Sequence, residues 1–206
     1  MVNHKYKFWE QQIPNETGML LTQVSDLSSL ERSEIIAQLP SIIGKQVLEL
    51  GAGIGRYTKT LIKDANQVIA IDFIKKFLHK NRQLTQNYNN VSHICASAQS
   101  LNFKPERFDI VFTNWLFMYL EDSEVNKLIQ HIHLWLKTSG IFFIRESCKI
   151  PSNNNPEFKY FTYYRDPEYY IDLLKNYFRI RRSGNVTIYH KLFNNPYQLF
   201  WLCEKY

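Results

Sequence analysis

Short apolar runs alternate with longer amphipathic segments through most of the chain. Apolar or strand-forming residues dominate five short runs, at 46–50, 67–72, 91–95, 108–114 and 141–145. The run at 108–114 is apolar almost throughout, which is typical of a strand covered on both faces of a parallel sheet. The segments between the runs carry apolar residues at helical spacing, most clearly from Val125 to Leu136. The alternation predicts an α/β fold with a doubly wound sheet.

The two ends of the chain complete this prediction. Within residues 1–40, apolar positions from Leu27 to Leu39 predict an amphipathic helix that ends at Pro40, as part of an N-terminal helical cap. Asp122 or Ser123 is expected to cap the helix that Gly140 closes. A helix from Pro167 to about residue 177 and strands near 178–190 and 197–205 follow. We therefore expect a single domain over 1–206, with a cap (1–40) and a Rossmann-like core (41–206) of seven mostly parallel strands.

One strand–loop–helix junction carries the most specific chemistry. Residues 49–55 are Glu-Leu-Gly-Ala-Gly-Ile-Gly, directly after the first predicted strand. Glycines let the backbone approach a ligand closely, and the following helix begins with free N–H groups. Asp72 ends the next strand, where a carboxylate can accept both hydroxyls of a ribose. The pattern predicts a site for a nucleoside-bearing cofactor.

The glycine spacing separates two cofactor classes. A dinucleotide loop has its third glycine where this chain has Arg56, which disfavours a nicotinamide enzyme. The Glu-x-Gly-x-Gly-x-Gly form resembles motif I of the class I S-adenosylmethionine-dependent methyltransferases. That resemblance implies S-adenosylmethionine as cofactor, with the loop around its amino-acid part and Asp72 on its ribose.

Longer blocks narrow the resemblance. Residues 48–58, 71–74, 113–120, 144–148 and 164–167 resemble the first catalytic half of the plant phosphoethanolamine N-methyltransferases. This implies in-line methyl transfer to the neutral amine of phosphoethanolamine or a similar small phosphorylated amine. Two alternatives stay open: a methyltransferase of the same fold with another small-molecule acceptor, and a catalytically inactive cofactor-binding partner subunit.

The resemblance also implies site residues. Tyr119 is assigned to catalysis, as a hydroxyl that helps to pass on the proton of the amine. The expected cofactor-binding residues are Glu49, Gly51, Gly53, Gly55, Asp72, Phe73, Ser97, Ala98, Asn114 and Trp115. The expected phosphate-binding residues are Tyr163, Tyr164, Arg165 and Lys191. No metal is expected, because a sulfonium is already a strong electrophile.

Structural roles compete with several of these assignments. Tyr119 could be a packed aromatic residue, and Trp115 a core residue. Arg145 could pair with Glu146 or Asp109 rather than contact a ligand. Ser97 stands where members of the family commonly have an aspartate, so it would hydrogen-bond the adenine without a charge.

Composition excludes some function classes. The net charge is +6, but lysines and arginines are spread along the chain, which does not favour nucleic acid as a partner. No apolar run approaches the length of a membrane span, and the N-terminus has no signal-peptide pattern. Three cysteines in apolar stretches predict core thiols in a reducing compartment, hence the cytoplasm. A monomer is compatible with the predicted site.

Overall fold

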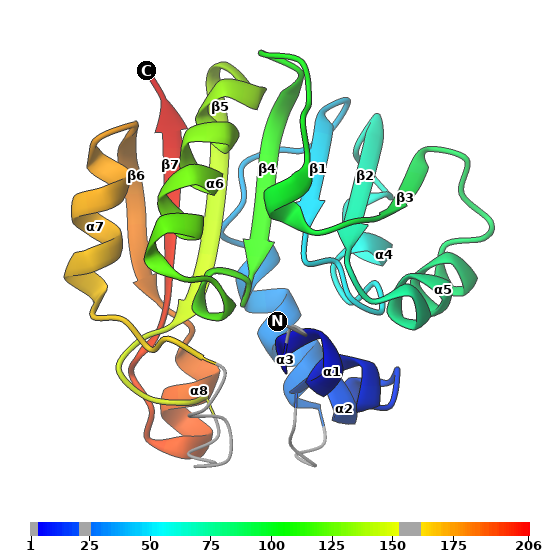
Figure 1. Cartoon of the computed structure of the whole chain (residues 1–206), viewed down its shortest axis with the longest axis horizontal. Helices are drawn as coiled ribbons and strands as arrows, with labels where there is room; N and C mark the ends of the chain where they lie inside the picture. The colour runs from blue at the N-terminus through cyan, green and yellow to red at the C-terminus, as the bar shows by residue number, and fades with distance from the viewer. Residues whose placement is uncertain (1–3, 21–25, 153–161) are drawn as a thin grey trace.

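A seven-stranded sheet runs through the centre of the protein (Figure 1). The protein is represented by a computed structural model that describes residues 4–20, 26–152 and 162–206. The strand order is β3-β2-β1-β4-β5-β7-β6. In chain order the strands are β1 Gln46–Leu50, β2 Gln67–Asp72, β3 Val91–Cys95, β4 Phe108–Asn114, β5 Leu136–Ser147, β6 Phe178–Asn185 and β7 Gln198–Lys205. This arrangement confirms the predicted Rossmann-like class of fold.

Helices cover both faces of the sheet and its lower edge in Figure 1. The α-helices are α1 His4–Gln11, α2 Glu16–Leu20, α3 Leu27–Ile36, α4 Thr58–Leu61, α5 Lys75–Leu84, α6 Asp122–Trp135, α7 Pro167–Lys175 and α8 Thr187–Phe193. Two short 3-10 turns, η1 Ala98–Ser100 and η2 Phe117–Tyr119, follow strands β3 and β4. None of the helices in the described part of the chain has the length and apolar character needed to cross a membrane.

The sheet topology determines where a ligand can bind. Strands β1 to β5 pair in parallel, whereas β7 is antiparallel to both β5 and β6. The chain moves outward from β1 to β2 and β3 and then returns to place β4 on the other side of β1. In open α/β sheets such a switch point leaves a crevice at the carboxyl ends of the strands. Helices α1 to α3 lie at that end of the sheet (Figure 1).

Each face of the sheet buries its own set of apolar side chains. On one face, the predicted stripe of α6, including Leu128 and Ile132, packs against β1, β4 and β5. On the other face, Leu27 and Ile35 of α3 pack with Val47 and Phe143 of the strands. Burial of these faces is the main stabilising term of the fold. The predicted stripe of α3 was wrong at Leu30, which is 50% exposed.

The boundary between α6 and β5 differs from its prediction. Helix α6 ends at Trp135, and Leu136 is extended and pairs with Phe108 of β4. Gly140 therefore lies inside β5 and does not close the helix. A register shift between Phe108 and Ile110 accommodates this early start of the strand. The pairing of Leu136 with β4 overrides a helical pattern that continues to this residue.

Four further predictions were wrong in detail. The segment predicted as strand to residue 190 is strand only to Asn185, and α8 follows it. The sequence also predicts a helix over 55–64, directly after the glycines, but only Thr58–Leu61 is α-helical. Glu121 rather than Asp122 or Ser123 caps α6, because Glu121 and Glu124 form a reciprocal capping box. Cys148 and Cys203 are buried, as expected, but Cys95 at the end of the edge strand β3 is exposed.

Candidate active site

A cavity opens at the switch point, between the carboxyl ends of the strands and the N-terminal helices. Its volume is about 860 Å³, including its mouth. Its lining is mainly apolar with a few polar side chains, which is typical of a site for a small-molecule cofactor or substrate. Of the predicted cofactor residues, those that line it are Glu49, Gly51, Asp72, Phe73, Ala98, Asn114 and Trp115. The predicted catalytic Tyr119 lines the same cavity.

The glycine loop has a conformation that few other residues could adopt. Gly51, Gly53 and Gly55 all have positive φ, at 74°, 53° and 90°. A Cβ on Gly55 would lie 2.6 Å from Oδ1 of Asn81, so a side chain there has no space. Gly53 and Gly55 are buried in the loop itself, where they shape the wall of the cavity.

Asp72 fixes the loop and also presents a carboxylate to the cavity. Its Oδ2 accepts a 2.8 Å hydrogen bond from the N–H of Gly53, and its Oδ1 accepts one of 2.8 Å from Ile74. Burial raises the pKa of Asp72 to about 6, although these backbone N–H groups oppose the rise. The group is therefore mainly ionised at neutral pH. Each oxygen keeps a second lone pair that can accept a ligand hydroxyl.

Glu49 differs from Asp72 in its state of protonation. Its Oε2 accepts a 2.6 Å hydrogen bond from the hydroxyl of Thr58, which in turn accepts one of 2.8 Å from Nδ2 of Asn81. Burial is the main cause that raises the pKa of Glu49 to about 8, and the charge of Asp72 raises it further. Glu49 is therefore mainly protonated at neutral pH, and it supports the loop as a neutral group.

A third buried carboxylate shapes the wall after β4. The oxygens of Glu146 accept hydrogen bonds of 2.9, 2.9 and 3.0 Å from the N–H groups of Leu116, Phe117 and Met118. Burial raises the pKa of Glu146 to about 7, although these N–H groups oppose the rise. Glu146 thus fixes turn η2, which carries Tyr119. The expected pairing of Arg145 with Glu146 or Asp109 does not occur, because Arg145 pairs with Glu31.

Tyr119 lies against the N-terminal helices. Its ring makes an edge contact with Trp9 of α1, with 5.5 Å between ring centroids. Burial raises the pKa of its phenol well above the usual value, and Tyr164 and Glu146 raise it further. The hydroxyl therefore stays protonated at neutral pH. It can donate and accept hydrogen bonds, but it cannot serve as a pre-formed phenolate base.

The predicted adenine contact lies outside the cavity wall. Ser97 is exposed, and its hydroxyl is hydrogen-bonded to Oε1 of Gln99. Its neighbours Ala96 and Ala98 line the cavity instead. The assignment of Ser97 to the cofactor stays a prediction.

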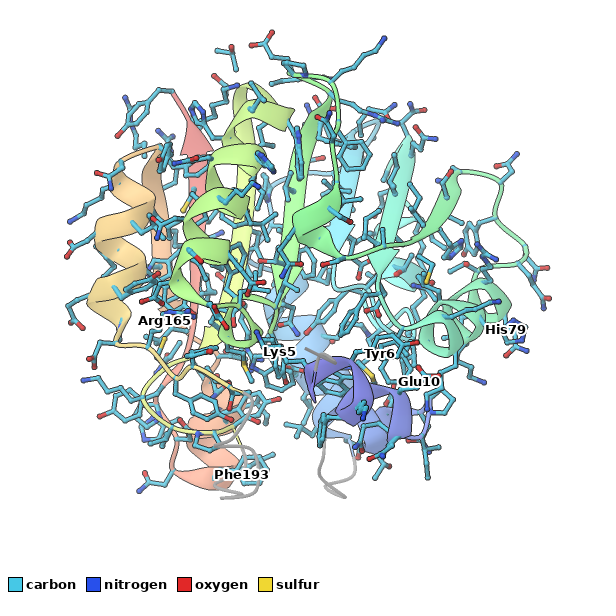
Figure 2. All side chains as sticks on the ribbon, in the orientation of Figure 1. Lys5, Tyr6, Glu10, His79, Arg165 and Phe193 are labelled. Carbon is cyan, nitrogen blue, oxygen red and sulfur yellow. The ribbon has the colours of Figure 1, made fainter. Side chains whose placement is uncertain are left out.

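The four predicted phosphate-binding residues do not line this cavity. Arg165 lies near the start of α7, away from Tyr6 and Glu10 of α1 (Figure 2). Its guanidinium donates to Oδ1 of Asp122 at 2.8 Å and to the carbonyl oxygens of Phe117 and Leu120 at 3.0 and 2.5 Å. The donors that were expected to bind phosphate thus hold the ends of η2.

The segment before Arg165 is nevertheless attached to the wall that carries Tyr119. The N–H of Tyr163 donates a 2.7 Å hydrogen bond to the carbonyl of Met118. Tyr164 is close enough to Tyr119 to raise the pKa of its phenol. Lys191 is exposed on α8. The phosphate-binding role of these residues stays a prediction.

Sequence reasoning missed part of the cavity wall. Trp9 and Met19 of the N-terminal helices line the cavity, and so does Arg56 at the end of the glycine loop. Arg56 pairs with Glu31 of α3, which is fully buried. One signal for this pair was present: Glu31 interrupts an apolar stripe midway between Leu27 and Ile35. A buried acid at such a position requires a cationic partner.

The protonated state of Glu49 yields a prediction about stability. A carboxyl whose pKa is raised on folding stabilises the protein below its unfolded pKa, and this contribution is lost as pH rises through the folded value, here about 8. As pH rises from about 5 to about 8.5, the unfolding free energy of the ligand-free wild type should fall. The fall in ligand-free Glu49→Gln should be smaller, and the two falls should differ by about 1 kcal/mol or more. Urea unfolding measures this difference. Glu10→Gln, at an exposed position, is the control for loss of a charge, and equal pH dependence in all three proteins would refute the assignment.

Comparison with known proteins agrees with this geometry. Residues 47–140 match a family model described as a methyltransferase domain. A phosphoethanolamine N-methyltransferase of Triticum aestivum is 40% identical over 97% of this chain and 43% of its own length. Phosphoethanolamine N-methyltransferase 3 of Arabidopsis thaliana is 40% identical over 92% of this chain and 41% of its own length. The chain thus spans less than half the length of these curated relatives.

A solved structure supports the same relationship. Phosphoethanolamine N-methyltransferase 1 of Haemonchus contortus, in complex with phosphoethanolamine and S-adenosylhomocysteine, superposes with a TM-score of 0.90 and 32% identity. The match covers 97% of this chain and 47% of that one. The glycine loop and Asp72 lie within residues 47–140, which match the methyltransferase model. The chain therefore has the fold of a class I methyltransferase, and over nearly its whole length it is similar to part of the phosphoethanolamine N-methyltransferases.

Proposed function

We propose that this protein transfers a methyl group from S-adenosylmethionine to the amine of phosphoethanolamine. The observation that carries the proposal is the cavity at the switch point, where the glycine loop and an ionised Asp72 share one wall with Tyr119. The relatives named above supply the identity of the acceptor.

The residues of the cavity fit the cofactor. The second lone pairs of Asp72 suit the two ribose hydroxyls, and Phe73, Ile74 and Ala98 offer an apolar surface for a flat base. Oδ1 of Asn114 is buried and accepts no hydrogen bond within the described part of the chain. A buried acceptor without a partner is costly, and a ligand ammonium would satisfy it. We therefore assign Asp72, the glycine loop and Asn114 to S-adenosylmethionine.

Catalysis in this proposal depends on orientation. When bound, S-adenosylmethionine supplies a methyl group on an electrophilic sulfonium. The chain must hold the amine in line with that methyl and free of its proton, and such alignment contributes several kcal/mol to catalysis. The phenol of Tyr119 remains neutral. Its oxygen is suited to accept a hydrogen bond from an N–H of the amine. Glu146 acts as a positioning residue, since it fixes the turn that carries Tyr119.

The phosphate end of the acceptor belongs, in our proposal, beside Tyr163, Tyr164 and Arg165. This segment is hydrogen-bonded to η2 next to Tyr119. Phosphate can compete with Asp122 for Arg165, because the Asp122 side chain is 69% exposed and its release into water costs little. Lys191 of α8 is the second candidate cation.

We further propose that the reaction takes place in the cytoplasm. All three cysteines are free thiols, which suits a reducing compartment.

Methyl transfer resolved by mass tests the proposed function. The full chain is incubated with S-adenosylmethionine and either phosphoethanolamine or free ethanolamine. We expect a methylated product from the phosphorylated acceptor alone. Product from neither acceptor, by a protein that binds S-adenosylhomocysteine, would refute the assigned acceptor while leaving the cofactor site intact.

The ribose assignment predicts the effect of Asp72→Asn. The change removes the negative charge. It also replaces one of the two oxygens by an N–H₂ group, which cannot accept the hydrogen bond that the N–H of Gly53 or of Ile74 donates in the wild type. We expect the dissociation constant for S-adenosylhomocysteine to rise at least about 30-fold, roughly 2 kcal/mol. Wild-type affinity should also weaken as pH falls below the pKa of Asp72, about 6, because protonation removes the acceptor charge. Isothermal titration calorimetry between about pH 5 and pH 8 would contradict the assignment if both proteins showed the same affinity and pH profile.

The phosphate assignment predicts that two substitutions at the Arg165–Asp122 ion pair affect KM for phosphoethanolamine differently. Arg165→Lys loses the bidentate geometry and should raise KM for phosphoethanolamine at least about tenfold, with KM for the cofactor changed less than about threefold. Asp122→Asn leaves the guanidinium intact and removes its competing carboxylate, so KM for phosphoethanolamine should stay equal or fall. Steady-state kinetics measures both constants. A similar rise of both KM values in Arg165→Lys would assign the residue a purely structural role.

A further inference from the structure

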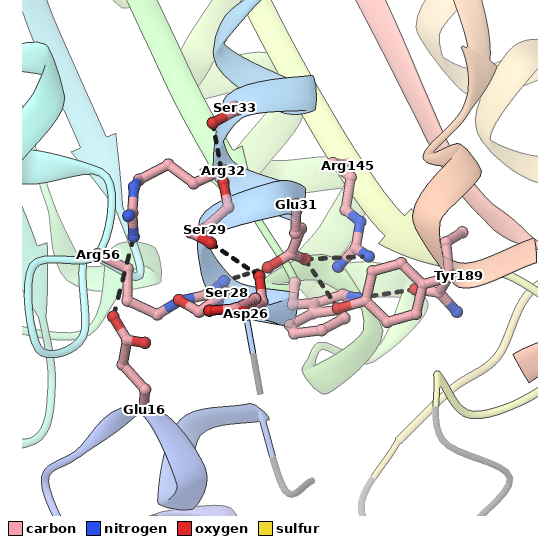
Figure 3. A network of polar contacts seen from close by, with 12 residues as sticks. Glu16, Asp26, Ser28, Ser29, Glu31, Arg32, Ser33, Arg56, Arg145 and Tyr189 are labelled. Atoms are coloured by element: carbon pink, nitrogen blue, oxygen red, sulfur yellow. Dashed lines mark hydrogen bonds and ion pairs between the residues drawn. The ribbon is translucent and has the colours of Figure 1, made fainter. Parts of the chain in front are cut away.

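A buried charge cluster joins the N-terminal cap to both ends of the cavity wall (Figure 3). At its centre is Glu31 of α3, whose side chain is fully buried. Its Oε2 accepts a hydrogen bond from Nη2 of Arg56, and its Oε1 accepts one of 3.0 Å from the hydroxyl of Tyr189. Nη2 of Arg145 lies 3.2 Å from the same Oε1. One carboxylate therefore contacts three segments that are far apart in the sequence.

Arg56 connects Glu31 to the cofactor end of the cavity. It directly follows Gly55 of the glycine loop and is itself part of the cavity wall. Its Nε donates a 3.1 Å hydrogen bond to the hydroxyl of Ser28, so α3 holds the guanidinium through two residues. A change in the position of α3 must therefore shift the end of the loop.

Arg145 connects Glu31 to the other end. It lies near the carboxyl end of β5, paired with Asn114 of β4, and its guanidinium stacks on the ring of Trp115, 3.8 Å from the centroid. Tyr189 of α8 flanks the same guanidinium at 4.9 Å. Trp115 lines the cavity directly before the turn that carries Tyr119. The orientation of this indole thus depends on a cation that Glu31 holds in place.

The energetics of the cluster favour a role in positioning. Burial alone would raise the pKa of Glu31, but the charges of Arg56 and Arg145 lower it below its usual value, so the group stays ionised. One carboxylate faces two guanidinium groups, and the nitrogens of Arg145 make no hydrogen bond with any described residue. Buried ion pairs seldom stabilise a protein more than apolar residues of similar volume would. What such a network does provide is a fixed geometry among the elements that it joins.

We propose that Glu31 is a positioning residue that sets the glycine loop through Arg56 and the Trp115–Tyr119 wall through Arg145. This inference rests on the proposed function, because it concerns the alignment of a cofactor and an acceptor bound at these two ends. A displacement of about 1 Å at either end is enough to lower the rate of an in-line transfer strongly. The cap helix α3 thereby belongs to the catalytic apparatus without contacting the reacting atoms.

The central test compares Glu31→Gln with Glu34→Gln. Glu34 lies on the same helix and also joins α3 to α8, since its carboxylate accepts hydrogen bonds from the N–H groups of Thr187 and Ile188. Among the described residues, its carboxylate forms no hydrogen bond or ion pair with the glycine loop or with β5. We expect Glu31→Gln to raise the dissociation constant for S-adenosylhomocysteine and to lower kcat, each at least about tenfold. Glu34→Gln should change both by less than about threefold, even if its Tm falls.

Two milder variants distinguish positioning from stability if Glu31→Gln does not fold. Arg56→Lys should weaken binding of S-adenosylhomocysteine and leave KM for phosphoethanolamine unchanged. Arg145→Lys should lower kcat and raise that KM by a larger factor than it raises the dissociation constant for S-adenosylhomocysteine, because Trp115 leads into the turn that carries Tyr119. Circular dichroism verifies that each variant is folded at the assay temperature. A purely structural cluster would lower Tm in all variants without this division between the two ligands.

Two results would overturn the proposal. One is a folded Glu31→Gln protein with wild-type affinity and kcat, and the other is a pair of arginine variants that change the same constants in the same proportion. Failure of the proposed function is distinguishable from both. If the wild type did not methylate phosphoethanolamine, titration of S-adenosylhomocysteine would still decide the claim, because Glu31→Gln and Arg56→Lys are expected to weaken its binding clearly more than Arg145→Lys and Glu34→Gln do.

Discussion

The return of the chain from β3 to β4 is the constraint on which the rest of the structure depends. Because β4 pairs with β1 on the side opposite to β2, the loops that follow β1 and β4 diverge and leave a crevice between them. The glycine loop and turn η2 are those two loops. The N-terminal helices cover this crevice, and Trp9 and Met19 become part of its wall. The proposed cofactor site and the proposed acceptor site both depend on this one topological feature.

Four buried carboxylates divide the work of shaping the cavity, and their partners determine their charge. Glu49 accepts hydrogen bonds from Thr58 alone among the residues that the structure describes, and it is mainly protonated. Asp72, in contrast, accepts the N–H groups of Gly53 and Ile74 and is mainly ionised. Glu146 accepts three backbone N–H groups and lies between these cases. Glu31 faces two guanidinium groups, so it remains ionised despite complete burial. Burial is common to all four, and the hydrogen-bond donors around each one decide whether it binds, supports or positions.

The sequence was sufficient for features that depend on local patterns. The runs at 91–95 and 108–114 became β3 and β4 with the predicted bounds, since apolar strand patterns bounded by turns are distinctive. The glycine spacing and Asp72 indicated where the cavity lies, because the loop of positive φ after β1 and the end of β2 form part of its wall. The boundary at Leu136 could not be predicted, since it is set by pairing with Phe108 far away in the sequence. The partners of Arg165 and Arg145 are likewise tertiary contacts, which short-range patterns do not encode.

A crystal structure of the protein with S-adenosylhomocysteine and phosphoethanolamine would test the central claim most directly. We expect the cofactor and the amine of phosphoethanolamine in the cavity at the switch point, with the phosphate beside Arg165. The ribose hydroxyls should lie within hydrogen-bonding distance of Asp72, and the amine of the acceptor should lie between the cofactor sulfur and Tyr119. A well-defined cofactor or acceptor amine bound outside this cavity, or a ribose that makes no contact with Asp72, would contradict the proposed site.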